Sequence, residues 1–406
     1  MKLILHRGAD EIGGTCIELI HSSGERIILD AGRPLDAPPE ATGLLPATLD
    51  LSGSATVLIC HPHQDHWGLI HELPGSWPIW TGEASARLIG ITSRLARRPL
   101  PQTFTTWKAG EVYSVGPFRI TPILTDHSAF DAAMLLIESD GRKLLYSGDF
   151  RRHGRKGGLV DRLRASPPSD VDLLILEGTN LGTDKPVMSE VALEADFINL
   201  MARKPGRIFT AWSGQNIDRT VTLYRAARRS GRDLVVDLYT AEVLEAIADG
   251  TRLPRPGFDN LKVVLTRGLR NHYAKAGRDD FVERMARHGI SASALTGSRH
   301  VVMLRDGLVR DFQAKGVVPG PDDAFVWSMW RGYLQEDGSA YAWARQGGAE
   351  LQFLHTSGHA SAADLRAFAA AISARRVLPV HGANWRMAGS DLPGLLPLAN
   401  GEVLDV

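Results

Sequence analysis

The sequence predicts an α/β fold with two sheet-containing parts. In residues 1–188, and again from residue 323 onward, short apolar strand-like runs repeatedly stop on a histidine or an acidic side chain. Between them, in residues 189–322, strand-like and helix-like runs alternate, which is typical of a parallel sheet flanked by helices. A chain of 406 residues with 44% hydrophobic side chains is long enough for more than one core. We therefore expect one discontinuous domain, residues 1–188 and 323–406, interrupted by an inserted α/β domain.

The composition excludes several classes of protein. Lysine plus arginine equals aspartate plus glutamate, 46 each, so contact with nucleic acid requires a local basic surface. Cys16 and Cys60 are too few for a disulfide framework, and we expect both to be buried and reduced. The N-terminal apolar run is too short for a signal peptide, and no run approaches the ~20 residues that span a bilayer. These features predict a cytoplasmic protein without a membrane segment.

The first elements form a β-meander that ends on an aspartate. Residues 2–5, 15–20 and 26–29 have the composition of short strands, and glycine-containing turns separate them. Asp30 follows the third strand directly. Its carboxylate either orients a metal-ligating histidine or simply forms the turn, and the sequence favours neither interpretation.

Four potential metal ligands lie within six positions after the strand-like residues 56–59. In an extended segment His61 and His63 point to the same side, and a tight turn then brings Asp65 and His66 to a neighbouring position. Imidazoles and a carboxylate suit zinc or a similar divalent ion, and the cluster can hold one ion or two. The alternative, a chance surface cluster, is disfavoured because further ligands follow downstream.

The same arrangement recurs along the rest of the first part. Three more apolar runs lead to a potential ligand: residues 120–124 to His127, residues 142–146 to Asp149, and residues 171–176 to Glu177. Since four strands in series end on such groups, we expect these side chains to lie along one edge of a sheet. That edge is where α/β and sandwich folds build their sites.

The inserted segment alternates helices and strands. Ser189 can cap a helix with the apolar stripe Val191, Ala195, Ile198 and Met201. Strands are expected at residues 207–211, 234–237 and 261–265, and helices at residues 218–229, 241–248 and 279–287. The segment contains no phosphate-binding Gly-x-x-x-x-Gly-Lys-Ser/Thr loop and no convincing dinucleotide fingerprint, so we expect no nucleotide cofactor. Basic side chains concentrate here; most indicate solvated helix faces, and some can meet phosphates.

The last segment returns to strands that end on histidines. Residues 350–354 precede Ser357, Gly358 and His359, and residues 377–380 precede His381. The remaining histidines considered lack a ligand partner nearby in sequence, and we interpret them as structural or surface residues: His71, His153, His272, His288, His300 and His355.

Together these segments resemble the β-CASP nuclease branch of the metallo-β-lactamase superfamily, and within it ribonuclease J. The resemblance covers nearly the whole chain and rests on residues 8–14, 30–32, 61–66, 125–128, 147–150, 177–180, 357–360 and 379–382. The His-x-His-x-Asp-His motif at residues 61–66 indicates only the superfamily. The β-CASP branch is indicated by Glu177 before the α/β insert and by His359 and His381 after it.

The resemblance implies an αββα metallo-β-lactamase sandwich with an inserted β-CASP domain. It implies a metal-dependent ribonuclease in which two divalent ions activate a hydroxide. The implied activity is that of a 5′-to-3′ exonuclease, an endonuclease or both. Zinc is the expected metal, with manganese or magnesium as alternatives. The ligands carried over are His61, His63 and His127 for the first ion, Asp65, His66 and His381 for the second, and Asp149 between them.

The resemblance also implies roles for residues around the metals. His359 contacts the scissile phosphate and assists proton transfer, Glu177 orients His359, and Asp30 supports the ligands. Asp65 counts as catalytic as well as metal-ligating. A histidine at position 381 favours RNA over DNA, and the expected partner is single-stranded RNA with a 5′-monophosphate end. Contacts with substrate phosphates are expected at Ser213, Asn216, Ser357 and Gly358.

Two departures from the ribonuclease J pattern matter. Ala383 follows Gly382 where ribonuclease J usually has glutamate, and the chain ends soon afterwards, as in a short form of the family without a C-terminal domain. The direction of cleavage and the assembly, monomer or homodimer, therefore stay open. Three alternative functions remain: a DNA nuclease of the same branch, a small-molecule metallohydrolase, and a non-catalytic RNA-binding protein. The large insert argues against the second, and the complete ligand set argues against the third.

Overall fold

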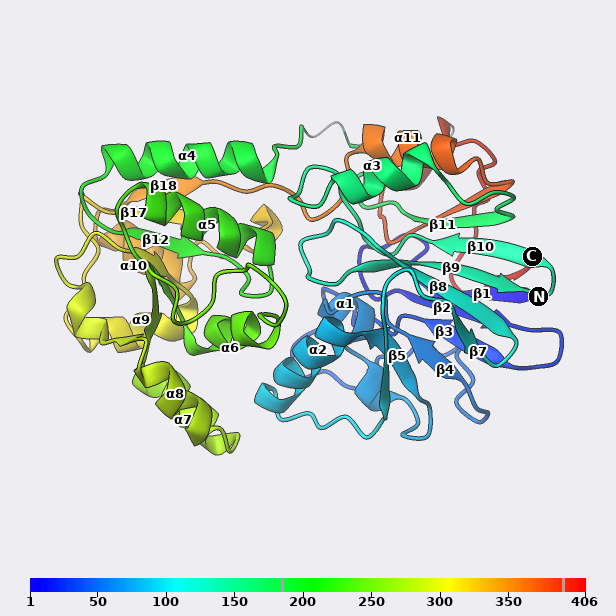
Figure 1. Ribbon diagram of the computed structural model, residues 1–406, viewed down its shortest axis with the longest axis horizontal. Helices are drawn as coiled ribbons and strands as arrows, with labels where there is room; N and C mark the ends of the chain where they lie inside the picture. The colour runs from blue at the N-terminus through cyan, green and yellow to red at the C-terminus, as the bar shows by residue number, and fades with distance from the viewer. Residues whose placement is uncertain (184–185, 389–390) are drawn as a thin grey trace. The chain divides into compact units, whose positions relative to one another are not determined.

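The computed structural model describes residues 1–183, 186–388 and 391–406 of the protein (Figure 1). The chain divides into two compact units. The first unit comprises Met1–Ser93, Arg98–Val187 and Gly358–Val406, and the second comprises Arg94–Arg97 and Met188–Ser357. Among the described residues, no helix has both the length and the apolar character needed to cross a bilayer.

Two sheets form the centre of the first unit. The first runs in the order β20-β1-β2-β3-β4-β5-β6, and the second in the order β19-β11-β10-β9-β8-β7. The first sheet consists of β1 (Lys2–Arg7), β2 (Cys16–Ile20), β3 (Arg26–Leu29), β4 (Thr56–Leu58), β5 (Ile79–Gly82), β6 (Phe104–Trp107) and β20 (Val403–Asp405). The second consists of β7 (Tyr113–Val115), β8 (Phe118–Leu124), β9 (Ala133–Ser139), β10 (Arg142–Tyr146), β11 (Leu173–Glu177) and β19 (Arg376–Val380).

Both sheets are buried on both faces, and their side chains follow the two-residue period of β-structure. In β3, Leu29 belongs to the core between the two sheets, and its neighbour Ile28 belongs to the core on the outer face. In β11, Leu173 lies between the sheets and Leu174 on the outer face. Central strands such as β3 and β11 therefore carry runs of buried apolar side chains, and candidate polar ligands follow at their ends.

Helices cover the two outer faces of the first unit. They are α1 (Gln64–Trp67), η1 (Ile70–Glu72) and α2 (Glu83–Leu95) on the first sheet, and α3 (Gly158–Ala165) and α11 (Ala362–Ile372) on the second, with α12 (Trp385–Ala388) near the C-terminus. Trp67 of α1 and Ile89 of α2 pack in the cluster of the first outer face. Val160 of α3 and Phe368 of α11 pack in the cluster of the second. The layers are helix, sheet, sheet, helix (Figure 1), which confirms the predicted αββα sandwich.

A parallel sheet forms the centre of the second unit, in the order β15-β14-β13-β16-β12-β17-β18. Its strands are β12 (Ile208–Ala211), β13 (Leu234–Val236), β14 (Leu261–Val264), β15 (Gly289–Ile290), β16 (Val301–Met303), β17 (Ala324–Trp327) and β18 (Glu350–Phe353). The helical segments are α4 (Glu190–Arg203), α5 (Ile217–Arg229), α6 (Leu238–Ala246), α7 (Arg267–Lys275), α8 (Asp279–Ala286), η2 (Ala292–Leu295), α9 (Asp306–Gln313), η3 (Arg331–Tyr333) and α10 (Ser339–Gln346). Phe312 of α9 and Trp343 of α10 pack on one face, and the paired helices α4 and α5 cover the other (Figure 1). The parallel α/β sheet predicted for the insert is confirmed.

The second unit extends further along the chain than the sequence analysis places it. The expected boundary after residue 322 leaves residues 323–357 with the first unit, whereas the structure assigns them to the second. The reason is strand pairing: Ala324 of β17 pairs with Ile208 of β12 on one side and with Glu350 of β18 on the other. Because these strand partners are distant in sequence, no local sequence pattern indicates that they pair.

Helix α4 buries a different face from the one its apolar stripe predicts. Phe197 and Leu200 are buried, whereas Val191, a member of the predicted stripe, is 65% exposed. The buried face also carries Glu190, whose Oε1 lies 3.2 Å from Arg219 Nη2, with both side chains removed from solvent. Of the predicted stripe only Met201 is buried, because the helix carries a second apolar run, Leu193, Phe197 and Leu200, which shares its buried face with Glu190 and Glu194.

The turn after β3 depends on a glycine. Here Ala31 N donates to the His66 carbonyl at 2.8 Å, which packs the turn against α1. A Cβ atom at Gly32 would lie 1.7 Å from the carbonyl oxygen of Asp65, so only glycine allows this approach. The backbone of Asp65 and His66 is thereby held against the tip of β3.

We predict that Gly32→Ala lowers the free energy of unfolding by about 3 kcal/mol or more, because the added methyl group must displace the backbone of α1. Urea unfolding measures the change. Gly90→Ala in α2 is the control: no heavy atom lies within 4 Å of its Cβ position, so it should raise the free energy of unfolding by about 0.5–1 kcal/mol. Similar effects of the two substitutions would contradict the steric account.

Candidate metal centre

The buried carboxylate of Asp30 organises the base of the site. Asp30 follows β3 with a φ of 60°, a left-handed conformation that few non-glycine residues adopt. Its Oδ1 accepts a hydrogen bond from Cys60 N at 2.8 Å. Its Oδ2 lies 2.6 Å from Tyr146 Oη, 2.7 Å from His66 Nδ1 and 2.9 Å from Cys60 Sγ. Asp30 therefore forms the turn and also contacts His66, and its role in orienting a metal-ligating histidine stays a prediction.

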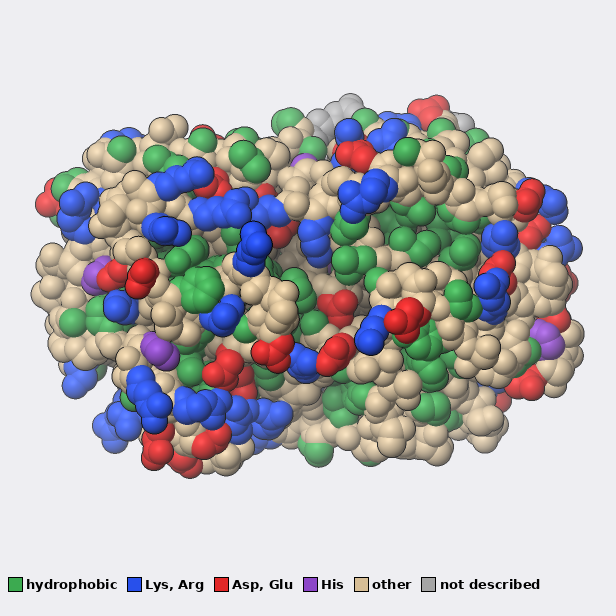
Figure 2. Space-filling model, in the orientation of Figure 1, with side chains coloured by type: hydrophobic (Ala, Val, Ile, Leu, Met, Phe, Trp, Pro, Cys, Tyr) green, Lys and Arg blue, Asp and Glu red, His purple; other side chains and the backbone are tan. Residues whose placement is uncertain are grey.

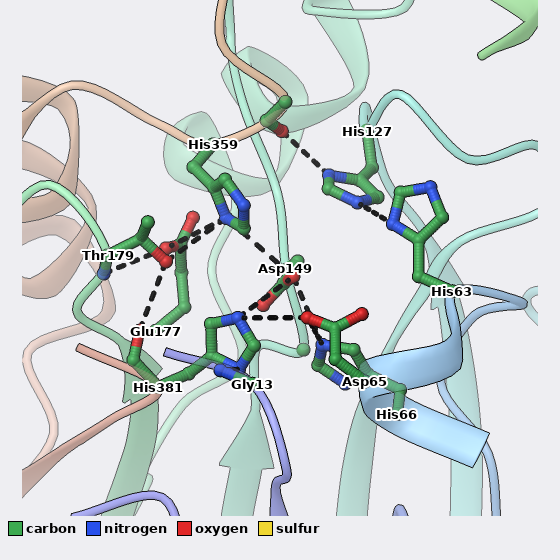
Figure 3. A network of polar contacts seen from close by, with 12 residues as sticks. Gly13, His63, Asp65, His66, His127, Asp149, Glu177, Thr179, His359 and His381 are labelled. Atoms are coloured by element: carbon green, nitrogen blue, oxygen red, sulfur yellow. Dashed lines mark hydrogen bonds and ion pairs between the residues drawn. The ribbon is translucent and has the colours of Figure 1, made fainter. Parts of the chain in front are cut away.

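A first group of histidines converges at the ends of β4 and β8. His61, His63 and His127 each offer a nitrogen atom, and these atoms lie within 4.8 Å of one another. His127 Nδ1 lies 2.7 Å from the Gly358 carbonyl and donates to it, which leaves the lone pair on Nε2. That Nε2 lies 3.1 Å from His63 Nδ1 (Figure 3). The Gly358 carbonyl thus holds His127 in the tautomer that can bind a metal.

A second group contains Asp65, His66, Asp149 and His381, again with ligand atoms within 4.8 Å of one another. Asp149 lies at its centre (Figure 3). Its Oδ2 is 3.1 Å from His66 Nε2 and 3.5 Å from His381 Nε2. The same oxygen is 3.8 Å from His61 Nε2 in the first group. One carboxylate therefore reaches both groups of ligands.

His381 is placed by a strained backbone and by the opposite end of the chain. It follows β19 with a φ of 55°, and its N donates to the Gly8 carbonyl at 2.7 Å. Its Nδ1 lies 2.9 Å from Thr15 Oγ1 and 3.3 Å from Gly13 N. The Gly13 N–H can only donate, so it favours a lone pair on Nδ1, whereas the closer Thr15 hydroxyl can donate or accept. If Nδ1 donates to Thr15, Nε2 faces Asp65 and Asp149 with its lone pair.

His359 lies beside the second group in a more exposed position. Its Nδ1 is 3.1 Å from Thr179 Oγ1, 3.4 Å from Glu177 Oε2 and 3.7 Å from Asp149 Oδ2. Its side chain is 21% exposed, whereas that of Glu177 is 1% exposed. Figure 3 shows Thr179 and Glu177 on one side of the His359 ring. Thr179 and Glu177 therefore hold Nδ1 of His359, while the imidazole ring stays partly exposed to solvent.

Most of the converging imidazoles are neutral near pH 7. Burial lowers the pKa of His61 well below its usual value, and the histidines around it lower it further. Burial likewise lowers the pKa of His63 to about 4, and it lowers the pKa values of His127 and His381. Neutral imidazoles carry the lone pair that a metal ion requires.

The charged groups gather around Asp149. Burial by itself would raise the pKa of Asp149, but His381 and His66 hold it well below its usual range. Burial by itself would lower the pKa values of His66 and His359, but Asp149 outweighs it. The pKa of His66 is raised well above its usual value, and that of His359 is raised to about 9. The buried carboxylates therefore favour positive charge at this point of the site.

Among the residues that the structure describes, several buried polar atoms lack partners, as expected for residues that fit a metal ion. Within the described part of the chain, the buried atoms His61 Nε2, His381 Nε2 and Asp149 Oδ1 have no hydrogen-bond partner. Leaving such atoms unpaired costs free energy unless a ligand satisfies them. Imidazole nitrogens and carboxylate oxygens in these numbers suit zinc, and manganese or magnesium less well.

The residues predicted to contact substrate phosphates are divided between the two units. Ser213 and Asn216 belong to the second unit, where Asn216 caps α5 by accepting a hydrogen bond from Arg219 N at 3.0 Å. Ser357 ends the second unit and Gly358 resumes the first. The carbonyl of Gly358 is engaged by His127, so the structure gives it a supporting contact.

Sequence reasoning missed four residues that hold the ligands: Thr15, Cys60, Tyr146 and Thr179. Cys60 immediately precedes His61, and Thr179 follows Glu177 by two positions, so proximity to a motif was an available signal. Thr15 and Tyr146 also adjoin motif residues, 8–14 and 147–150, but their partners His381 and Asp30 lie far away in sequence, so proximity did not indicate what they contact. Among the described residues, the histidines interpreted as structural or surface residues join no group of metal-ligating side chains.

Comparison with protein families matches residues 349–388 to the Zn-dependent metallo-hydrolase RNA specificity domain. This segment begins at β18, includes His359 and α11, and passes through β19 to His381. The matched stretch therefore carries one of the predicted metal ligands and the predicted proton-transfer residue.

Curated relatives of the chain are ribonucleases J. The Mycobacterium tuberculosis protein is 24% identical over 94% of this chain and 68% of the relative. The Helicobacter pylori protein is 26% identical over 92% of this chain and 55% of the relative. A shorter match, 24% identical, covers 44% of this chain and 33% of the Sinorhizobium meliloti protein. The chain thus spans from a third to about two thirds of the length of these relatives.

A solved structure supports the fold independently. A protein of unknown function from Enterococcus faecalis superposes with a TM-score of 0.78 at 18% identity, over 99% of both chains. This likeness shows that the fold of the whole chain occurs in an experimental structure. With the ribonuclease J relatives and the RNA specificity segment, the predicted resemblance to the β-CASP branch of the metallo-β-lactamase superfamily, and within it to ribonuclease J, is confirmed.

Proposed function

We propose that the protein is a metal-dependent ribonuclease that hydrolyses RNA phosphodiester bonds with two divalent ions. The observation that carries the proposal is the convergence of seven histidine and aspartate side chains from separate strand ends, with unpartnered buried donor atoms among them. Similarity to ribonucleases J supports RNA as the substrate.

The ligand groups assign each residue a place. His61, His63 and His127 would hold one ion, and Asp65, His66 and His381 the other. Asp149 would contact both, because its Oδ2 lies within 3.8 Å of a nitrogen in each group. When bound, two divalent ions supply a water of lowered pKa and neutralise charge on the phosphoryl oxygens. We propose zinc for this donor set, with manganese or magnesium as alternatives.

His359 would handle the proton of the reaction. Its pKa, raised to about 9, keeps the imidazole protonated near pH 7. Glu177 and Thr179 hold Nδ1, and Nε2 is the atom that would contact a phosphate or protonate a leaving oxygen. Its side chain is more exposed than the buried side chains of His61, His66 and Asp149, and this exposure would permit contact with a polymer substrate.

A basic helix face in the second unit offers a contact for the RNA backbone. Helix α7 carries Arg267, Arg270 and Lys275, all exposed, and no acidic residue. Within the described residues, none of the three forms an ion pair. Figure 2 shows lysine and arginine side chains gathered over α7 and α8. Because the whole chain has no net charge, this local surface provides the attraction for phosphates.

We also propose that the turn after β12 binds the 5′-monophosphate end. The Oδ1 atom of Asn216 caps α5, which leaves its amide Nδ2 as a donor at the N-terminal end of the helix. Ser213 lies in the same turn, and Asn216 N donates to the Ser213 carbonyl at 2.9 Å. Ser357 and Gly358, next to His359, would meet the phosphate nearer the cleavage point.

We predict that His63→Ala or Asp65→Ala lowers the rate of RNA hydrolysis by more than about 100-fold, the upper end of what loss of a supporting residue costs. RNA binding should change little, because neither residue belongs to the basic surface of α7. Initial rates on labelled single-stranded RNA, with bound metal counted per chain, test this. His71→Ala is the control, since His71 lies outside the ligand groups. Near-normal turnover of His63→Ala in metal-controlled buffer would overturn the assignment.

A second prediction concerns the α7 surface. Replacing Arg267, Arg270 and Lys275 with alanine should weaken RNA binding and reduce the slope of log K against log salt by about 2, since each phosphate contact on a single strand contributes about 0.7. Metal content should not change. The control is Arg284→Ala on α8, because Arg284 is already paired with Asp280 and Glu245. An unchanged salt slope in the triple variant would exclude this surface.

A third prediction concerns the 5′ end. Ser213→Ala should reduce the ratio of cleavage rates for 5′-monophosphorylated over 5′-triphosphorylated RNA, because a donor to the monophosphate is lost. Sizing the products of both substrates with zinc or manganese measures the ratio and separates exonuclease from endonuclease cleavage. Single-stranded DNA in parallel separates RNA from DNA specificity. An unaltered ratio in Ser213→Ala and Asn216→Ala would remove the turn from the site.

A further inference from the structure

The thiol of Cys60 lies between a carboxylate and a metal-ligating histidine. Cys60 follows β4, is 1% exposed, and its Sγ is 2.9 Å from Asp30 Oδ2 and 3.1 Å from His61 Nδ1. The same sulfur is 3.5 Å from His66 Nδ1. A thiol can donate one hydrogen bond and accept another weakly. Its two close neighbours therefore match its two capacities.

The donor and acceptor roles follow from the partners. The carboxylate of Asp30 accepts, so the thiol hydrogen points to it, and the sulfur is left to accept from His61 Nδ1–H. This assignment leaves the lone pair of His61 on Nε2. That atom is buried and has no hydrogen-bond partner among the described residues, and it lies 3.8 Å from Asp149 Oδ2. The contacts of Cys60 thus select the tautomer in which His61 can bind a metal.

The same carboxylate orients the second group of ligands without the thiol. His66 Nδ1 lies 2.7 Å from Asp30 Oδ2, much closer than to Cys60 Sγ, so His66 donates to Asp30 directly. His66 Nε2 then faces Asp149 at 3.1 Å. Asp30 consequently supports one histidine of each ligand group, His66 by direct contact and His61 through the sulfur atom.

We propose that Cys60 is a positioning residue of the metal centre: its thiol relays the orientation set by Asp30 to His61 and fixes the Nδ1-protonated tautomer of that ligand. The proposal rests on the proposed metal binding only for its effect on affinity. The tautomer itself is a property of the metal-free protein.

Simple packing is the competing explanation, because Cys60 belongs to the core between the two sheets and a Cβ atom at Gly148 would lie 3.0 Å from its sulfur. The two explanations predict different orders of effect for substitutions of Cys60 on the His61 tautomer and on metal affinity. If packing decides, Cys60→Ala, which keeps an apolar side chain no larger than cysteine, is tolerated at least as well as Cys60→Ser. If the hydrogen bonds decide, Cys60→Ser is close to the parent protein, and Cys60→Val and Cys60→Ala both fail.

The first experiment reads the tautomer in metal-free protein labelled with ¹⁵N-histidine, by long-range proton–nitrogen correlation. We expect His61 to be protonated at Nδ1 in the parent protein and in Cys60→Ser. In Cys60→Ala and Cys60→Val we expect a mixture or the Nε2-protonated form. Cys16→Ala is the control, since Cys16 is the other buried cysteine and lies in β2. A single Nδ1-protonated form in Cys60→Val would overturn the proposal.

The second experiment measures zinc affinity by competition with a chelator. We expect one of the two ions to bind about 10–100-fold more weakly in Cys60→Ala and Cys60→Val, as for other residues that orient a ligand. Cys60→Ser should stay within a few-fold of the parent protein and of Cys16→Ala. Parent-like affinity in Cys60→Val would overturn the proposal, as would a thiolate-to-metal absorption band in the cobalt-loaded parent, which would make Cys60 a ligand itself. If the parent protein binds no divalent ion, the proposed function fails, while the tautomer measurement still decides the role of Cys60.

Discussion

The structure of the site depends on one buried carboxylate and the donors that satisfy it. Asp30 is fully removed from solvent, and a carboxylate in such a place is tolerated only when hydrogen bonds replace its hydration. The donors come from different layers: Cys60 and His66 follow β4 in the first sheet, and Tyr146 ends β10 in the second. Burial and Asp30 raise the pKa of Tyr146 well above its usual value, so the phenol remains a donor. The network therefore ties both sheets together directly beneath the ligands.

The sandwich supplies what the ligand cluster lacks by itself. Bringing several imidazoles and two carboxylates together in a buried place, with some donor atoms unpaired, opposes folding. Apolar packing between the sheets and on both outer faces offsets this cost, because the central strands, such as β3, β4, β10 and β11, bury side chains on two sides. The left-handed backbone at Asp30 and His381 is tolerated for the same reason. Such a rigid core would hold the proposed metal ligands in a fixed geometry.

The second unit shows a different use of charge. Its parallel sheet is apolar, but α4 and α5 enclose an ion pair between Glu190 and Arg219, and Arg219 also donates to the Ser328 carbonyl at 2.7 Å. These buried charges satisfy one another and are not available to a ligand. The exposed cations of α7 are the opposite case, because they lie on a helix without acids. Composition alone cannot separate the two kinds of arginine, since both contribute equally to a net charge of zero.

The sequence by itself determined the nature of the strands, the parallel character of the insert and the identity of the candidate ligands. These are local properties: the two-residue period, the alternation of strand and helix, and the position of His61, Asp149 or His381 just after an apolar run. Only the tertiary structure decided which strands pair, and hence that residues 323–357 belong to the second unit. It also decided which side chains orient the ligands, such as Thr15 beside His381, because such contacts join positions hundreds of residues apart. Hydrogen bonds and strand pairs between such distant positions follow from the packing of the whole chain. The spacing of residues within a motif does not predict them.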